Sequence, residues 1–343
     1  MCIGMGMLQL VFQEFLERAG ELTFWRILAG LAMLGGAGMY LWGALPRATK
    51  DIGILGAGIL LVGFAAQAVE SRRARYAYPL PQIALLLACG MGIHIIIVLA
   101  ADAPYPLASA PLAPPEGLRW RMLRLAQMAA IALPVLAYLF EGVAERFEGK
   151  PELARWGRVG MLAGAAGMPV LLVLAAMQNP EFKDLLAFPV GATVLGTWVA
   201  AWMAWSSEAP GNRGEAMFWA IIGLSMAVGQ WMGTFAFDGP LPAPAWMQDY
   251  LTYARRAIRL AHTYGIMLGI AGIFLTRRAE TNDAYGIARG GLRIFTVGTI
   301  LTLGALIVAS WSKVAGWVLA TGPATVALGA GVSLIAARVR GRD

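Results

Sequence analysis

The stretch "RLAHTYGIMLGIAGIFLTRRAE" at residues 259–280 aligns without gaps on "RLAQMAAIALPVLAYLFEGVAE" at residues 124–145, 135 positions earlier. A second pair of segments, "HIIIVLAADAPYPL" at 94–107 and "QWMGTFAFDGPLPA" at 230–243, aligns at an offset of 136 and shares one Asp and two Pro positions. Self-similarity at a fixed period is the sequence signature of an internal repeat. The chain is therefore predicted to contain two copies of one unit.

The composition places the chain in a lipid bilayer. Of its 343 residues, 59% are hydrophobic and 14% are charged, which is far from the balance of a soluble domain. Apolar runs of about 20 residues, long enough to cross a hydrocarbon core of roughly 30 Å, recur along the chain. We expect an all-α polytopic membrane protein with ten transmembrane helices. The runs 52–70 and 315–337 are the weakest of the ten, so a count of eight stays open. The expected spans are 25–46, 52–70, 83–101, 120–142, 158–178, 187–206, 216–236, 255–276, 291–311 and 315–337.

The repeat unit is predicted to be four helices long. Residues 52–180 form the first copy and residues 185–312 the second. Residues 1–51 are expected to contain an interfacial helix and the first transmembrane helix, and residues 313–343 the last transmembrane helix with a basic tail. Because four is an even number, both copies enter the membrane from the same side. This parallel arrangement excludes the inverted repeat found in many secondary transporters.

The basic residues predict the orientation. Seventeen of the 27 Lys and Arg residues fall on the side that holds both ends of the chain, so both termini are expected in the cytoplasm, with the protein in the inner membrane of a bacterium. The net charge of +7 mostly reflects this asymmetry. No nucleic-acid partner is needed to explain it.

Four polar residues are predicted to lie at one depth in the membrane. His94 and Gln230 each lie eight residues before an Asp that precedes an outer Pro-rich loop, and Gln127 and His262 lie about eight residues into the returning helices. At 1.5 Å per residue, all four are about 12 Å below the outer boundary. A polar side chain at this depth is costly and points to function.

His94 and His262 are the only histidines of the chain, and they have two interpretations. They are either ligands of a haem iron, or hydrogen-bond donors across a helix interface, as glutamine can be. A zinc or copper ion requires three or four ligands, whereas haem requires one or two. Glycines on the same helix faces, Gly265, Gly269 and Gly90, would leave room for a flat ring, or else let the helices pack closely.

Two arginines lie next to these positions. Arg259 precedes His262 by three residues, and Arg124 precedes Gln127 by the same spacing, on the outer side. A guanidinium there is suited to pair with a haem propionate, and the alternative is that it extends to the lipid headgroups. Two ligation schemes stay open, since one haem could be held jointly by both histidines, or each histidine could ligate its own haem.

The segments "GQWMG" at 229–233 and "YARRAIRLAHTYG" at 253–265 resemble the haem A synthase family. That family has two four-helix bundles related by duplication, with paired histidines near the outer face. The resemblance implies that His262 is a haem ligand and covers the eight helices from 52 to 311. The family's Glu-x-x-His-Arg motif is absent, because His94 stands in "GMGIHIII". The resemblance therefore implies a relative that keeps haem, rather than an active synthase.

The sequence favours a b-type haem protein that transfers electrons as a subunit of a larger respiratory or photosynthetic complex, rather than a catalyst on its own. One or two haems are expected, with His94 and His262 as iron ligands, Arg259 and Arg124 at the propionates, and Gln127 and Gln230 as polar support. Two alternatives stay open. A cofactor-free anchor subunit similar to the polysulfide reductase type would bind a quinone through His94, His262, Asp102 and Asp238, and a structural accessory subunit would only contact other membrane subunits.

Overall fold

The computed structural model describes the helical core of the chain. The described residues are 50–73, 80–102, 118–147, 149, 151–207, 212–235, 242–245, 253–280, 285–311 and 322–332, with six single positions between 28 and 39. They are helical apart from short turns and connections, and no strand occurs among them. The predicted interfacial helix of the first twenty residues lies outside this part of the chain.

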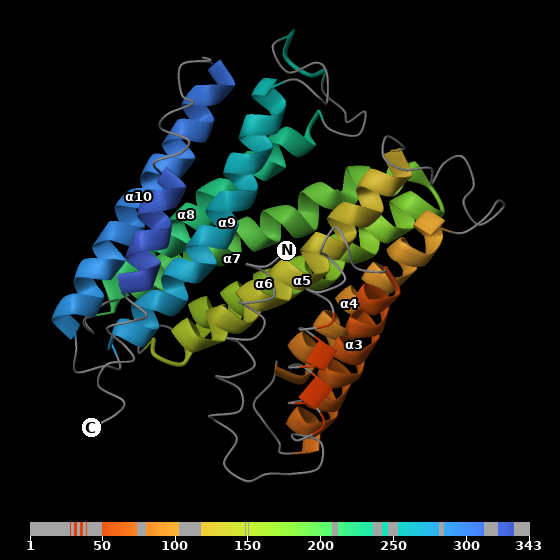
Figure 1. Cartoon of the computed structure of the whole chain (residues 1–343), viewed down its shortest axis with the longest axis horizontal. Helices are drawn as coiled ribbons and strands as arrows, with labels where there is room; N and C mark the ends of the chain where they lie inside the picture. Colours follow the sequence, from red (N-terminus) through yellow and green to blue (C-terminus); the bar gives the residue numbers. More distant parts are fainter. Residues whose placement is uncertain are drawn as a thin grey trace. The chain divides into compact units, whose positions relative to one another are not determined.

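Between residues 50 and 311, the described part of the chain forms eight α-helices and one short 3-10 helix (Figure 1). They are α3 (Lys50–Arg73), α4 (Leu80–Asp102), α5 (Leu118–Ala144), α6 (Pro151–Met177), η2 (Pro180–Leu186), α7 (Ala187–Ser206), α8 (Asn212–Gly233), α9 (Tyr253–Glu280) and α10 (Tyr285–Trp311). A further helical stretch covers Gly322–Val332. The all-α fold class is confirmed.

Six of the described helices are long and apolar enough to cross a membrane. They are Arg121–Ala144, Pro151–Met177, Glu181–Ser206, Arg213–Gly233, Tyr253–Arg277 and Arg289–Ala309. Three shorter apolar helical stretches are Ile54–Val69, Gln82–Ile93 and Gly322–Val332. A helix satisfies every backbone polar group within its own segment, so it is the structure that these apolar runs adopt in lipid.

By its contacts the chain divides into two compact units. The first consists of Met1–Glu141 and Arg158–Thr193, and the second of Gly142–Gly157 and Val194–Asp343. In the first unit, α3 packs against α4, and Arg158 of α6 forms a bidentate ion pair with Glu141 of α5 at 2.7 to 3.0 Å. In the second unit, α9 packs against both α8 and α10 (Figure 1).

The contact between α8 and α9 is built from glycines that face larger residues. A methyl group added to Gly265, Gly269 or Gly272 of α9 would overlap a side chain of α8, and one added to Gly229 of α8 would overlap an imidazole of α9. The facing pairs, in order along the seam, are Gly272 with Phe218, Gly269 with Ile222, Gly265 with Ser225, and His262 with Gly229. Small residues let membrane helices approach until their backbones are close. At four successive levels, therefore, a glycine of one helix faces a larger residue of the other.

Buried threonine hydroxyls are satisfied within their own helices. Thr193, Thr276, Thr299 and Thr302 each donate a hydrogen bond to the backbone carbonyl four residues earlier, at 2.7 to 2.9 Å. A buried hydroxyl without a partner would cost free energy in an apolar environment. These threonines therefore add small side chains to the core without leaving a polar group unsatisfied.

The glycine-matched seam predicts a difference between two glycine-to-alanine variants. In Gly269→Ala the new methyl overlaps Ile222 and lies 3.2 Å from the backbone oxygen of Phe218, so the variant is expected to lose about 1–3 kcal/mol of unfolding free energy. Gly304 of α10 has no atom within 4 Å of the same position, so Gly304→Ala is the matched control and should be neutral or slightly stabilising. Reversible unfolding in mixed micelles measures both, and equal effects would contradict the described packing.

Candidate functional site

His262 lies in the seam between α8 and α9. Its Nδ1 lies 2.6 Å from the backbone carbonyl oxygen of Ser225 on α8, and its half-buried ring occupies the space that a side chain at position 229 would need. Position 229 is a glycine, so the ring fits against the α8 backbone. The predicted hydrogen bond across a helix interface is thus present, with a backbone carbonyl as its acceptor.

This hydrogen bond sets the protonation pattern of the neutral imidazole. A carbonyl oxygen can only accept, so Nδ1 carries the proton and Nε2 carries the lone pair. Nε2 has no hydrogen-bond partner among the described residues. Histidines that ligate a metal commonly donate their other ring N–H to a backbone carbonyl in this way, which fixes the tautomer and the ring orientation. The donor chemistry of His262 therefore fits an axial ligand that coordinates through Nε2.

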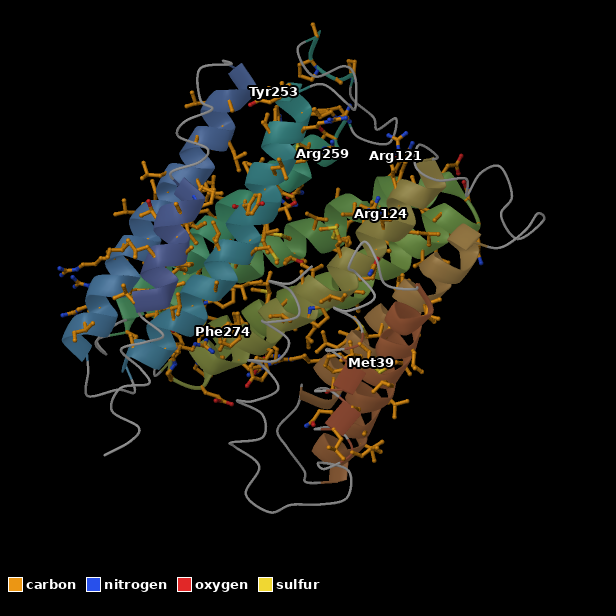
Figure 2. All side chains as sticks on the ribbon, viewed as in Figure 1. Met39, Arg121, Arg124, Tyr253, Arg259 and Phe274 are labelled. Atoms are coloured by element: carbon orange, nitrogen blue, oxygen red, sulfur yellow. The ribbon has the colours of Figure 1, made fainter. Side chains whose placement is uncertain are left out.

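The other predicted residues lie on α4, α5, α8 and α9. Arg259 is half-buried on α9, three residues before His262, and Figure 2 places it with Tyr253 towards one end of the helix, with Phe274 towards the other. Gln230 of α8 and Gln127 of α5 are half-buried, and Arg124 of α5 is exposed. His94 lies within α4, but its side chain is outside the described part of the structure.

The glycines beside the histidines do not leave a slot for a flat ring. Ser225 occupies the space beside Gly265, and Ile222 occupies the space beside Gly269. A Cβ on Gly90 of α4 would lie 2.9 Å from the carbonyl oxygen of Ala130 on α5. The slot prediction is therefore wrong at these three positions, because the neighbouring helix fills the space. A planar ligand at His262 would have to lie on the Nε2 side of the imidazole.

No cluster of three or more His, Cys, Asp or Glu residues that could hold a metal ion occurs in the described part of the chain. A zinc or copper site needs three or four such ligands, so none is formed by these residues. Haem needs one or two axial ligands, and the ligand count at His262 is compatible with it.

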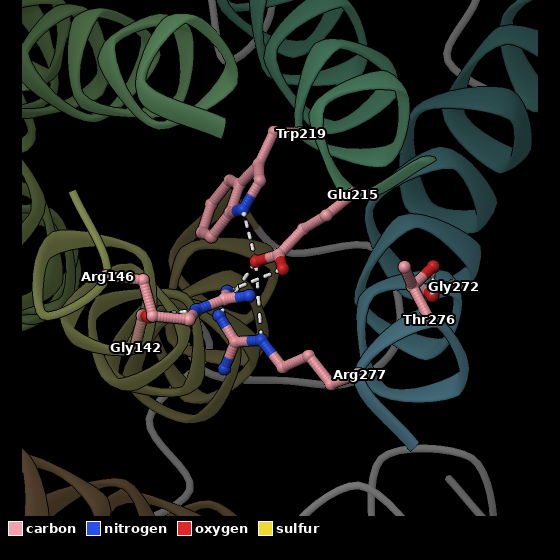
Figure 3. A network of polar contacts seen from close by, with 7 residues as sticks. All are labelled: Gly142, Arg146, Glu215, Trp219, Gly272, Thr276 and Arg277. Carbon is pink, nitrogen blue, oxygen red and sulfur yellow. Dashed lines mark hydrogen bonds and ion pairs between the residues drawn. The ribbon is translucent and has the colours of Figure 1, made fainter. Parts of the chain in front are cut away.

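A buried ion cluster lies near the other end of the same seam (Figure 3). Glu215, in the first turn of α8, has a fully buried side chain and accepts hydrogen bonds from Arg146 at 2.6 Å and from Arg277 of α9 at 2.8 Å. The indole N–H of Trp219 donates to the same carboxylate at 3.3 Å, and Arg146 also donates to the Gly142 carbonyl at 2.7 Å. Two guanidinium groups and one indole thus surround a single carboxylate.

The helix termini favour this arrangement of charges. A carboxylate is stabilised near the N-terminus of a helix and a cation near the C-terminus, which are the positions of Glu215 on α8 and Arg277 on α9. Neither Glu215 nor Glu141 is among the site residues predicted from the sequence. An acidic residue in an apolar segment is itself a signal, and it would have identified both Glu215 and Glu141.

Comparison with known protein families, with curated proteins and with solved structures gives no match to this chain. The resemblance to the haem A synthase family therefore stays a prediction from the two short segments that carry it.

The ion cluster predicts a large stability loss when its carboxylate is neutralised. Glu215→Gln leaves two guanidinium groups without their shared counter-ion, and removing one partner of a buried ion pair typically costs about 3–5 kcal/mol. The lower end is expected here, because the Arg146 side chain is 37% exposed and is partly solvated. Glu152→Gln, at an exposed position in the first turn of α6, is the control. If both variants unfold at the same denaturant concentration in micelles, the cluster does not stabilise the protein.

Proposed function

We propose that this chain is a membrane-embedded b-type haem protein that transfers electrons, with His262 as one iron ligand. The observation that carries the proposal is the hydrogen bond from His262 Nδ1 to the Ser225 carbonyl, which leaves Nε2 as the lone-pair nitrogen without a described partner. An unprotonated nitrogen held in a fixed orientation inside an apolar segment is what axial ligation requires.

The same tautomer favours iron over a quinone as the ligand of His262. A quinone carbonyl needs a hydrogen-bond donor, and in the neutral ring the only N–H is already donated to Ser225. Nε2 can accept a proton or a hydrogen bond, or it can coordinate a metal. Two alternatives are a quinone-binding anchor subunit and a structural accessory subunit. A visible spectrum of the purified protein distinguishes both from the haem protein.

The remaining predicted residues have supporting roles in this proposal. His94 is the other proposed iron ligand, of the same haem or of a second one, Arg259 and Arg124 pair with propionates, and Gln127 and Gln230 are polar support. Bound haem supplies a one-electron couple between ferrous and ferric iron. The protein then acts as a subunit of a larger respiratory or photosynthetic complex in the inner membrane of a bacterium, with both termini in the cytoplasm.

The ten-helix layout with two parallel repeats belongs to the same proposal. Helix α5 begins at residue 118 and α9 at residue 253, which is 135 positions later and equals the offset of the aligned sequences. Helix α6 begins at residue 151 and α10 at residue 285, an offset of 134. The apolar stretches at 54–69, 82–93 and 322–332 lie where three of the additional spans are expected.

The test is a visible spectrum, reduced minus oxidised, of the purified full chain and of His262→Gln. Glutamine is the residue at the matching position of the other repeat, Gln127, so it keeps an amide that can donate to Ser225 but does not ligate iron in the usual way. The wild type should show sharp haem bands, and the variant should lose at least half of their intensity per chain.

Ser225→Ala is the matched control for this test. His262 uses the backbone carbonyl of Ser225 and not its hydroxyl, so the alanine variant should keep the full bands. A folded wild-type chain without haem bands would refute the proposal. Quinone extracted from that same sample would favour the anchor subunit, and the absence of both would favour the structural subunit.

A further inference from the structure

Helix α10 presents an exposed face on the side that its two neighbours in the second unit do not occupy. Leu303 faces α9, and the stretch 322–332 packs against Phe295, Gly298 and Thr302. The exposed residues follow one another at spacings of three and four, so they lie on one face of the helix. They are Arg289, Arg293, Val297, Ile300, Gly304 and Ile307.

This face is charged at one end and apolar along the rest. Its two charged residues are Arg289 and Arg293, and α10 contains no Asp or Glu. The apolar span of this helix begins at Arg289 and ends at Ala309. Arg293 therefore lies four residues, or about 6 Å, inside the span. Two like charges four residues apart repel each other, so this end of the face favours an anion.

The direction of the helix brings both arginines to the membrane boundary. Side chains of an α-helix lean towards its N-terminus, which for α10 is the end near these two residues. The apolar stem of Arg293 can follow the helix surface while its guanidinium reaches the level of Arg289. Both guanidinium groups are thus expected at the depth of the lipid phosphates.

Other arginines at the ends of the apolar helices have an internal counter-charge. Arg158 pairs with Glu141, and Arg146 and Arg277 share Glu215. Arg293 has no ion-pair partner among the residues that the structure describes. A cation inside an apolar span is costly unless a charge of the opposite sign accompanies it. An anion from the bilayer itself would supply this charge.

We propose that the exposed face of α10 binds an anionic phospholipid. Its phosphate lies between Arg289 and Arg293, and one acyl chain follows Val297, Ile300 and Gly304. Guanidinium groups form charge-assisted hydrogen bonds with phosphate, and basic residues at a membrane surface attract anionic lipids. A methyl group on Gly304 would have no atom within 4 Å, so an acyl chain can approach the helix backbone there. This inference does not depend on haem.

The experiment adds phosphatidylglycerol or phosphatidylcholine to the purified full chain in detergent micelles. Native mass spectrometry counts the lipid that stays bound, and thermal unfolding gives the midpoint. The wild type should retain about one phosphatidylglycerol on this face and unfold at a higher midpoint, because a ligand of the folded state stabilises it. Phosphatidylcholine, which has no net charge, should have little effect. Binding should weaken about 5-fold in Arg293→Gln and about 5-fold more when Arg289→Gln is added.

Two further variants control for the loss of charge and for folding. Arg155→Gln removes an exposed arginine from α6, where Glu152 lies three residues earlier, and should bind phosphatidylglycerol like the wild type. Arg293→Lys keeps the charge but loses the planar two-pronged geometry, so its affinity should lie between those of the wild type and Arg293→Gln. The lysine variant keeps the test valid if the glutamine variants do not fold.

Three results would overturn the inference. The first is a folded double variant that binds phosphatidylglycerol as tightly as the wild type. The second is an equal rise of the midpoint with phosphatidylcholine or with inorganic phosphate alone, which would show a site without preference for an anionic lipid. The third is a membrane protein that co-purifies with the wild type but not with the double variant, while phosphatidylglycerol binding is unchanged.

Discussion

The close approach of α8 and α9 is the constraint on which the candidate site depends. Lipid is as apolar as leucine, so helices in a membrane gain little from hydrophobic burial, and their association relies on close packing and on polar contacts. Gly272, Gly269 and Gly265 receive side chains of α8 at three successive levels. A shift of one helix by a single turn would place one of these side chains against a larger residue, either Phe218 against Thr276 or Ser225 against His262. Packing along the seam therefore favours the register that places His262 over Gly229.

The two ends of this seam are held by different chemistry. Near one end, Glu215 is enclosed by Arg146 and Arg277. In buried ion pairs of this kind, the free energy lost by removing the charges from water offsets much of the Coulomb attraction. The clearest contribution of this ion cluster is to fix the register of α8 against α9, because any other register would separate these charges in an apolar environment. Near the other end, the contact is one hydrogen bond from an imidazole to a backbone carbonyl. The ion cluster thus restricts sliding of α8 along α9. The hydrogen bond of His262 leaves its Nε2 available to a ligand.

The sequence was sufficient to predict the all-helical fold, but not the contacts between the helices. The predicted span 187–206 coincides with α7, because a long apolar run in lipid has no alternative to a helix. The role of Gly265 and Gly269 was not decided by the sequence, because it depends on which residues of α8 face them. Glu215 is 62 residues from Arg277, and no local pattern indicates their contact.

The packing at position 229 also limits how an iron ligand set can be built within the second unit. The His262 ring fills the space of a side chain on Gly229, so a second imidazole from α8 at this level would require the first to leave. The two positions share one space, and one space holds one ring.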